Sequence, residues 1–266
     1  MTATITLLTD FGPSGVAASE MKGVLISLAP EIHLVDISHT ISPQNIPEAA
    51  RILSRSPFYF PEGTIHIFVV DPGVGTARRP IAARIGSQRF VGPDNGALTL
   101  ALRRAEAEGW PVEVFKLDQP RYWRPKISNT FHGRDIFSPV AAHLALGVPL
   151  EAVGSPITDP VILPLPTVER TAHGVRGEIA VVVKHFGNLI TNIHANDMAD
   201  LGDVSVRVCG IEILGLVRTF GDRPPGEWVA LIGSEDELVL AVVNGHAGDQ
   251  LGAKVGDTVE VVRASA

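Results

Sequence analysis

Four short apolar runs in the first hundred residues each end at or near an aspartate. They are ITLLTD (5–10), IHLVDISH (32–39), IHIFVVD (65–71) and RFVGPDNG (89–96). Runs of this length are typical of buried strands in a mostly parallel sheet. Helix-like segments at 18–28 and 47–55 lie between them. This alternation of strand and helix predicts an α/β fold.

The aspartates in these runs also predict where a ligand binds. In open α/β sheets, ligands bind in the crevice beyond the carboxyl ends of the strands. Asp10, Asp36, Asp71 and Asp94 lie at or near those ends in the predicted sheet. We therefore expect an acidic site along one edge of the sheet.

The second half of the chain has a different pattern. Short β-rich runs (EIAVVVKHF, VSVRV, WVALIG, LVLAVV and DTVEVV) are divided by Gly, Pro, Asn and Asp, which is typical of a small sandwich or barrel. A helical pattern at 136–146 precedes a proline-dense stretch at 149–166, which has the composition of a linker. We predict an N-terminal α/β domain over 1–166, with a mostly parallel sheet, and a smaller C-terminal all-β, barrel-like domain over 174–266.

Composition excludes several classes of partner and site. The 266 residues carry a formal net charge of -7, which argues against nucleic acid or an anionic membrane as a partner. Cys209 is the single cysteine, so neither an internal disulfide nor a cysteine zinc site can form. No basic segment precedes the first apolar run, and no apolar stretch is long enough to span a bilayer. We expect a cytoplasmic protein.

The stretch VVDPGVGTARR (69–79) is the first candidate for a functional loop. Gly73 and Gly75 let the backbone approach a ligand closely, and Arg78 can pair with Asp71 across a compact loop. The loop lacks the pattern of a nucleotide P-loop. On these residues alone, a turn with an exposed ion pair is an equally good interpretation.

Three further motifs carry candidate side chains. His132 lies in NTFHGRD, where a loop meets a helix, and is either structural or catalytic. Asp10 in TDFG could hold a ribose diol or cap the next helix. In HFGNLITNI, Phe186 offers a stacking face and Asn188 an amide that suits a purine edge, although an Asx turn with a core phenylalanine explains the motif equally well.

Seven motifs, in order along nearly the whole chain, resemble one family. They are TDFG, EMKG, VDISH, FPEGTIHIFVVDPGVGTARRPIA, FVGPDNG, TFHGRD and FGNLITNI. Together they are similar to the S-adenosylmethionine hydrolases, also called S-adenosyl-L-methionine hydroxide adenosyltransferases, which are relatives of the fluorinase and the chlorinase. The resemblance implies an N-terminal α/β domain and a C-terminal β-barrel-like domain. It also implies a homotrimer whose active sites lie between the N-domain of one subunit and the C-domain of its neighbour.

The resemblance further implies roles for individual residues. The family's catalytic Asp-Arg-His triad falls on Asp71, Arg78 and His132. The substrate-binding positions fall on Asp10 for the ribose hydroxyls, Phe186 and Asn188 near adenine and the methionyl end, Ser234 and Glu235 for the methionine carboxylate, and Val242 near adenine.

The implied reaction is hydrolysis of S-adenosyl-L-methionine to adenosine and L-methionine, by in-line attack of water or hydroxide on C5′. A sulfonium leaves as a neutral thioether, so the reaction needs neither a general acid nor a metal, and we expect no cofactor. The halogenating relatives carry a tyrosine at the position of Asp71. A carboxylate repels a halide but accepts a hydrogen bond from water, which favours hydrolysis over halide transfer.

Two other functions remain open at the level of sequence. A metal-dependent phosphohydrolase could use a strand-end cluster of Asp10, Asp36, His39, Asp71 and Asp94. Alternatively, the protein could bind adenosine or S-adenosylmethionine without turnover. Lys184 supports this last possibility, because many family members carry an acidic residue there that can meet the methionine ammonium.

Overall fold

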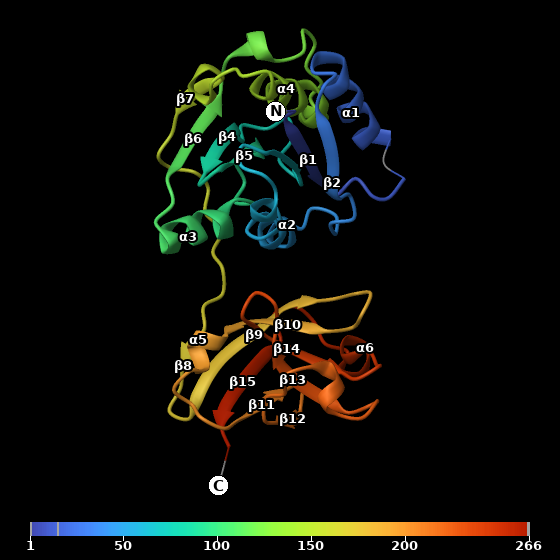
Figure 1. Cartoon of the computed structure of the whole chain (residues 1–266), viewed down its shortest axis with the longest axis vertical. Helices are drawn as coiled ribbons and strands as arrows, with labels where there is room; N and C mark the ends of the chain where they lie inside the picture. The colour runs from blue at the N-terminus through green and yellow to red at the C-terminus, as the bar shows by residue number, and fades with distance from the viewer. Residues whose placement is uncertain (1, 15, 265–266) are drawn as a thin grey trace. The chain divides into compact units, whose positions relative to one another are not determined.

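The computed structural model describes residues 2–14 and 16–264. The chain divides into two compact units, Met1–Leu163 and Pro164–Ala266 (Figure 1). The first contains helices and a sheet, and the second consists chiefly of strands. Across the described residues, every helix is too short or too polar to traverse a lipid bilayer.

The four apolar runs form adjacent strands of the sheet in the first unit. They correspond to β1 (Thr4–Thr9), β2 (His33–Ser38), β3 (Ile65–Val69) and β5 (Gln88–Pro93). Strand β1 pairs in parallel with β2 and with β3, and β3 pairs in parallel with β5. This part of the sheet is the predicted parallel arrangement.

The remaining strands make the sheet mixed rather than mostly parallel. The strand order is β2-β1-β3-β5-β4-β6-β7, and β4 (Pro80–Ile85), β6 (Val112–Leu117) and β7 (Gly154–Pro156) pair in an antiparallel manner. A tight turn with Gly86 at φ 59° joins β4 to β5. Such a turn leaves no room for a crossover, so the two strands must run in opposite directions.

Helices cover both faces of this sheet. They are α1 (Val16–Leu28), α2 (Ile46–Leu53), α3 (Thr99–Glu108) and α4 (Ser138–Ala145), with short turns at Ser56–Tyr59, Pro120–Tyr122 and Leu150–Ala152. The helix-like segments at 18–28 and 47–55 are confirmed by α1 and α2. The segment predicted as a helix at 136–146 consists of a π-helical turn at Gly133–Phe137 followed by α4.

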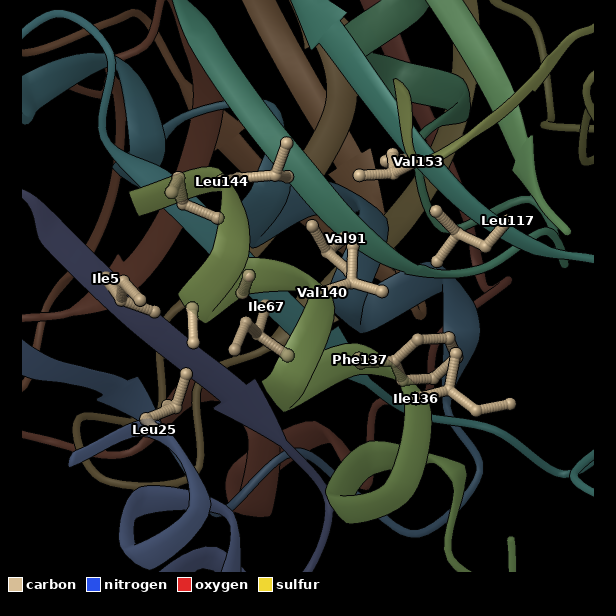
Figure 2. Close-up of a cluster of buried hydrophobic side chains, with 14 of the residues drawn as sticks. Ile5, Leu25, Ile67, Val91, Leu117, Ile136, Phe137, Val140, Leu144 and Val153 are labelled. Carbon is tan, nitrogen blue, oxygen red and sulfur yellow. The ribbon is translucent and has the colours of Figure 1, made fainter. Parts of the chain in front are cut away.

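Alternate residues of the strands serve two separate cores. In β3, Ile67 packs in a cluster with α1 and α4, whereas Phe68 packs in a cluster with α2 and α3. This follows from the period of two in a strand. Figure 2 shows the first cluster, in which Val140 and Leu144 of α4 lie with Ile67 of the sheet. The sheet is therefore packed on both of its faces.

The prediction of a linker at 149–166 is partly wrong. Its first half contributes β7, an edge strand, where proline is tolerated because an edge carries unpaired backbone positions. Farther along, the backbone N–H of Val161 donates to Asp94 at 2.8 Å, and that of Leu163 donates to the hydroxyl of Thr99 at 2.9 Å. The chain is thus bonded to the first unit almost as far as Pro164.

The second unit is an antiparallel, barrel-like sheet, and the predicted α/β fold with a C-terminal β domain is confirmed. In the described part of the chain its strand order is β12-β11-β15-β9-β10-β14-β13, with β8 paired to β9. The bounds are β8 Glu169–Arg170, β9 Gly174–Val182, β10 Leu189–His194, β11 Val204–Val208, β12 Ile211–Leu214, β13 Trp228–Ile232, β14 Glu237–Val242 and β15 Thr258–Arg263, with short helices α5 (Ala195–Met198), α6 (Ala247–Leu251) and Phe220–Asp222. A bridge between Val217 and Leu231 joins the segment after β12 to β13.

Candidate active site

The carboxyl edge of the parallel strands carries Asp10 and Asp71. Thr9 at the end of β1 pairs with Val69 at the end of β3, so the chain leaves the sheet at the same level in both places. The two aspartates follow within two residues of that pair. The expected acidic edge therefore exists, because the parallel register puts both strand ends together.

Asp71, Arg78 and His132 form one hydrogen-bonded group. Nε of Arg78 lies 3.0 Å from each carboxylate oxygen of Asp71, and Nη2 lies 2.5 Å from Oδ2. The same Nη2 lies 2.9 Å from Nδ1 of His132. The side chains of Arg78 and Asp71 are only 9% and 3% exposed, so solvent screens this pair weakly. The structure thus brings together three residues that lie up to 61 positions apart in the sequence.

The contact with Arg78 determines which ring nitrogen of His132 carries the proton. A guanidinium nitrogen can only donate, so Nδ1 of His132 must accept, and the neutral ring carries its proton on Nε2. Burial lowers the pKa of His132, and the positive charge of Arg78 lowers it further, which outweighs the opposing effects of Asp71 and Asp135. At neutral pH the ring therefore presents an Nε2–H donor.

The flat face of the Arg78 guanidinium also packs against an aromatic ring. Its guanidinium carbon lies 5.3 Å from the centre of the Phe137 ring, a distance typical of a cation–π contact. Nη1 is buried and has no hydrogen-bond partner among the residues that the structure describes. A buried donor of this kind needs a partner, and a bound water or substrate atom can supply one.

Three loops meet around this group. The carbonyl oxygen of Asn129 lies against Gly75, in the space that a Cβ on Gly75 would occupy. Phe131 packs edge-on against Phe11, with ring centres 5.8 Å apart. The TDFG loop, the loop after β3 and the loop before α4 therefore support one another through packing as well as through hydrogen bonds.

Asp135 anchors the loop that carries His132, a role that the sequence interpretation missed. Its fully buried carboxylate accepts hydrogen bonds from Arg134 at 2.7 Å, from Arg124 at 3.0 Å and from the N–H of Ser128 at 2.8 Å. Burial opposes its ionisation, but the bonds from Arg134, Ser128 and Arg124 outweigh that effect and lower its pKa. Arg134 also bonds Glu20 of α1 at 2.9 Å. The motif FHGRD offered a signal, because two adjacent opposite charges follow the histidine.

The other strand-end aspartates have separate partners. Asp94 is bonded to Arg79 at 2.8 Å and Asp36 to Lys22 at 2.6 Å, while Asp10 accepts the N–H of Gln44 at 2.8 Å. No group of three or more His, Cys, Asp or Glu side chains that could hold a metal occurs in residues 2–14 and 16–264. The five residues of the phosphohydrolase hypothesis are therefore not gathered into one metal site.

In the second unit, Phe186, Asn188 and Val242 lie at one end of the sheet. Phe186 and Asn188 belong to the loop between β9 and β10, and the pairing of Leu189 with Leu240 places this loop beside the end of β14, where Val242 lies. The Phe186 side chain is 65% exposed, so it is not the core residue of the alternative interpretation. Gly187 in the same loop packs against His246.

Ser234 and Glu235 lie at the other end of β14, in the turn that follows β13. Ser234 is exposed and Glu235 is half-buried. A strand rises about 3.3 Å per residue, so β14 separates this turn from Val242 by roughly 17 Å. The structure thus groups three of the predicted binding residues of this unit and places the two predicted carboxylate-binding residues apart from them.

Comparison with known proteins places these features in a family. Residues 5–154 match the sequence model of the SAM hydroxide adenosyltransferase N-terminal domain, and residues 177–260 match that of the C-terminal domain. The chain is 39% identical to the (R)-S-adenosyl-L-methionine hydrolase of Thermus thermophilus, covering 96% of this chain and 98% of that one. It is 38% identical to the enzyme of the same name from Salinispora tropica, covering 97% of each.

A solved structure gives the same result for the fold. An uncharacterized conserved protein from Thermotoga maritima superposes with a TM-score of 0.88 at 36% identity, covering 97% of this chain and all of that one. Both domain models, the full-length relatives and the superposition agree. The chain belongs to the SAM hydroxide adenosyltransferase family.

Proposed function

We propose that this protein hydrolyses S-adenosyl-L-methionine to adenosine and L-methionine. Relatives that are 38–39% identical over nearly their full length carry that activity in their names, and those names specify the (R) epimer at sulfur. The observation that carries the proposal is the hydrogen-bonded group of Asp71, Arg78 and the half-buried His132 at the carboxyl end of β3. We extend the (R) preference to this chain.

The reaction is one displacement at C5′ of the adenosyl group. The water oxygen forms a bond to C5′ as the C5′–S bond breaks, and sulfur keeps the electron pair and becomes a neutral thioether. The protonated 5′ oxygen then loses a proton, which passes to solvent. Because the leaving group is neutral, the enzyme needs to stabilise the nucleophile rather than the departing methionine.

Asp71 acts in this scheme as a hydrogen-bond acceptor for the nucleophile. Full removal of a proton from water by an ordinary carboxylate would cost about 16 kcal/mol, so deprotonation before attack is excluded. The carboxylate instead orients the water and takes increasing proton density as the O–C5′ bond forms. A water held in this way, out of bulk solvent and in line with the C5′–S bond, gains chiefly from orientation.

Arg78 and His132 position Asp71 and the water. Arg78 fixes the plane of the Asp71 carboxylate through its fork of donors. His132 accepts from Arg78 through Nδ1, so its Nε2–H is left to donate to the water or to the developing 5′ hydroxyl. The histidine therefore works as an orienting donor, not as a general base.

Substrate binding is shared between the units. We assign the ribose hydroxyls to Asp10, the adenine to Val242, and the adenine and methionyl end to Phe186 and Asn188. Ser234, and Glu235 through its backbone N–H, are assigned to the methionine carboxylate. By analogy with the family, the active form is a cytoplasmic homotrimer in which the first unit of one subunit meets the second unit of another. Nucleic acid and membranes are not partners in this proposal, because the chain is acidic overall.

The test is incubation with (R)-S-adenosyl-L-methionine in oxygen-18 water, with and without chloride, followed by mass spectrometry of the products. Hydrolysis at C5′ places the label on the 5′ hydroxyl of adenosine and yields no chloroadenosine. Unlabelled adenosine would contradict attack by water at C5′. Tight binding of S-adenosylmethionine without any product would support the non-catalytic alternative.

A further inference from the structure

The loop that carries Asp10 is fastened to the segment that follows β2. The backbone N–H of Gly12 donates to the carbonyl oxygen of His39 at 2.7 Å. The hydroxyl of Thr9 lies 2.9 Å from Nδ1 of the same histidine. On the other side, the N–H of Gln44 donates to Oδ2 of Asp10 at 2.8 Å. These bonds hold the residues before, at and after Asp10.

An irregularity in the sheet puts His39 in this place. Successive residues of β1, Leu7 and Leu8, pair with Asp36 and Ser38 of β2, so β2 carries one extra residue at this point. Such a bulge bends its strand and redirects the side chains that follow. As a result, the residue directly after β2 lies beside the last residue of β1.

His39 is itself held on its far side. Its Nε2 lies 3.1 Å from Oδ1 of Asp36, an ion-pair distance, although this buried nitrogen makes no hydrogen bond among the described residues. Oδ2 of Asp36 accepts a hydrogen bond from Lys22 at 2.6 Å. A carboxylate accepts only, which favours the proton on Nε2 and leaves Nδ1 to accept from the hydroxyl of Thr9. The order Asp36, His39, Thr9 is that of a hydrolase triad, but Thr9 is fully buried, so its hydroxyl cannot reach a substrate. The arrangement acts on the loop instead.

Gln44 supplies the bond to the carboxylate from a strained backbone. Its φ of 61° lies in the left-handed region, which non-glycine residues adopt at a cost of about 1 kcal/mol. In this conformation its N–H holds Oδ2 of Asp10. Oδ1 of Asp10 has no hydrogen-bond partner in the described part of the chain, so this oxygen is left for a ligand.

We propose that His39 is a positioning residue for Asp10. By holding Thr9 and Gly12 on either side, it fixes the direction of the free carboxylate oxygen toward the ribose hydroxyls of the substrate. The inference rests on the proposed function through one premise, namely that Asp10 binds the ribose. Loss of the His39 side chain should therefore change the recognition of the ribose rather than the binding of adenine or the rate of the chemical step.

The test compares the affinities of the full-length protein for adenosine and for 2′,3′-dideoxyadenosine by titration calorimetry. A hydroxyl bonded to a carboxylate contributes enough for the wild-type protein to prefer adenosine at least about tenfold. Asp10→Ala removes the preference. We expect His39→Ala to reduce it to about threefold or less, while the affinity for the dideoxy compound stays within about twofold.

Two further variants separate positioning from folding. Thr9→Val deletes the hydroxyl that His39 bonds and should reproduce the loss of preference, whereas Thr9→Ser keeps the hydroxyl and should keep the preference. His33→Ala is the matched control, because His33 is an exposed histidine at the start of β2, the strand that His39 follows. It should change neither affinity.

The outcomes are distinguishable. If Asp10→Ala loses the preference while His39→Ala and Thr9→Val keep it, His39 does not position Asp10. If Asp10→Ala keeps the preference, the premise that Asp10 binds the ribose is wrong, although hydrolysis of S-adenosylmethionine is unaffected by that result. Equal weakening of both ligands in His39→Ala and Thr9→Val would show a general structural role and would also overturn the inference.

Discussion

The carbonyl oxygen of Asn129 fills the space beside Gly75 that any side chain there would need. Gly75 also has a φ of 76°, which favours glycine. The loop after β3 and the loop before α4 therefore touch through their backbones. The distance between Asp71 and His132 depends on this contact as well as on Arg78.

Gly75→Ala should separate the two loops and lower the turnover of S-adenosylmethionine at least tenfold. The matched control is Gly109→Ala. Gly109 ends α3 with a similar φ of 68°, but nothing lies within 4 Å of its missing Cβ. Backbone strain should cost each variant about 1 kcal/mol of stability, measured by urea unfolding, and Gly75→Ala should lose more because of its clash with Asn129. Equal turnover in the two variants would show that the loop contact is not needed for activity.

Asp71→Asn should lower kcat at least tenfold while the dissociation constant of adenosine stays within about threefold. The amide keeps the size of the side chain but presents one weaker acceptor to the water and a donor to Arg78. Asp159→Asn is the control, because Asp159 is an exposed carboxylate that also bonds an arginine, Arg79. Normal adenosine production by Asp71→Asn would show that the Asp71 carboxylate is not needed for the reaction.

Arg78→Lys and Arg79→Lys should have different effects. A lysine at 78 cannot bond both Asp71 and His132 as the guanidinium does, so we expect turnover to fall at least tenfold. Arg79 instead bonds the buried Asp94 and the exposed Asp159. Its replacement should lower the free energy of unfolding by about 1–3 kcal/mol with little change in kcat. If Arg79→Lys lowers turnover while Arg78→Lys lowers only the free energy of unfolding, Arg79 rather than Arg78 acts in the reaction.

His66 should make stability depend on pH. It is fully buried between Thr6 and Gln88, and burial lowers its pKa to about 4. In the unfolded chain, the His66 ring binds a proton near pH 6.5. The contribution of the neutral ring to the free energy of unfolding is therefore fully present above that pH. It is lost as the pH drops toward 4, by about 3 kcal/mol. The difference in the free energy of unfolding between pH 7.5 and pH 5, measured with urea, should be smaller for His66→Gln than for the wild type. The exposed control His33→Gln should retain the wild-type difference.

Phe186→Ala should weaken adenosine binding about tenfold without changing the melting temperature, because the ring is 65% exposed and supports no core. Phe220→Ala is the control, as Phe220 lies in the same unit and is 41% exposed. Its affinity for adenosine should equal that of the wild type. A fall in the melting temperature for Phe186→Ala alone would mean that the ring is structural.

The parts of this site that follow strand ends could be predicted from the sequence. Each apolar run stops close to its aspartate, so the hydrophobic pattern alone predicts that Asp10 and Asp71 lie at one edge of the sheet. Local sequence left Arg78 with two interpretations, since its contact with His132 spans 54 residues and depends on how two loops pack. The family resemblance, not the local pattern, indicated that group.

Other features depend on contacts that no local pattern records. Asp135 and His39 matter because of what packs against them, and the bulge that brings His39 beside Thr9 leaves no mark in the hydrophobic pattern. The antiparallel direction of β4 had a local signal, the Gly-Ser turn in RIGSQRF, which is typical of a hairpin. A hairpin at that turn implies a mixed sheet.

Arg78 and Arg79 are neighbours in the chain, yet one bonds Asp71 and the other holds the segment that leads out of the first unit. Pro80 favours an extended backbone at Arg79, and side chains alternate along an extended chain. Insertion or deletion of one residue between Pro72 and Ala77 would therefore move both arginines out of register with Asp71 and Asp94 and disturb both contacts at once. The length of this loop is therefore as much a part of the arrangement as the arginines themselves.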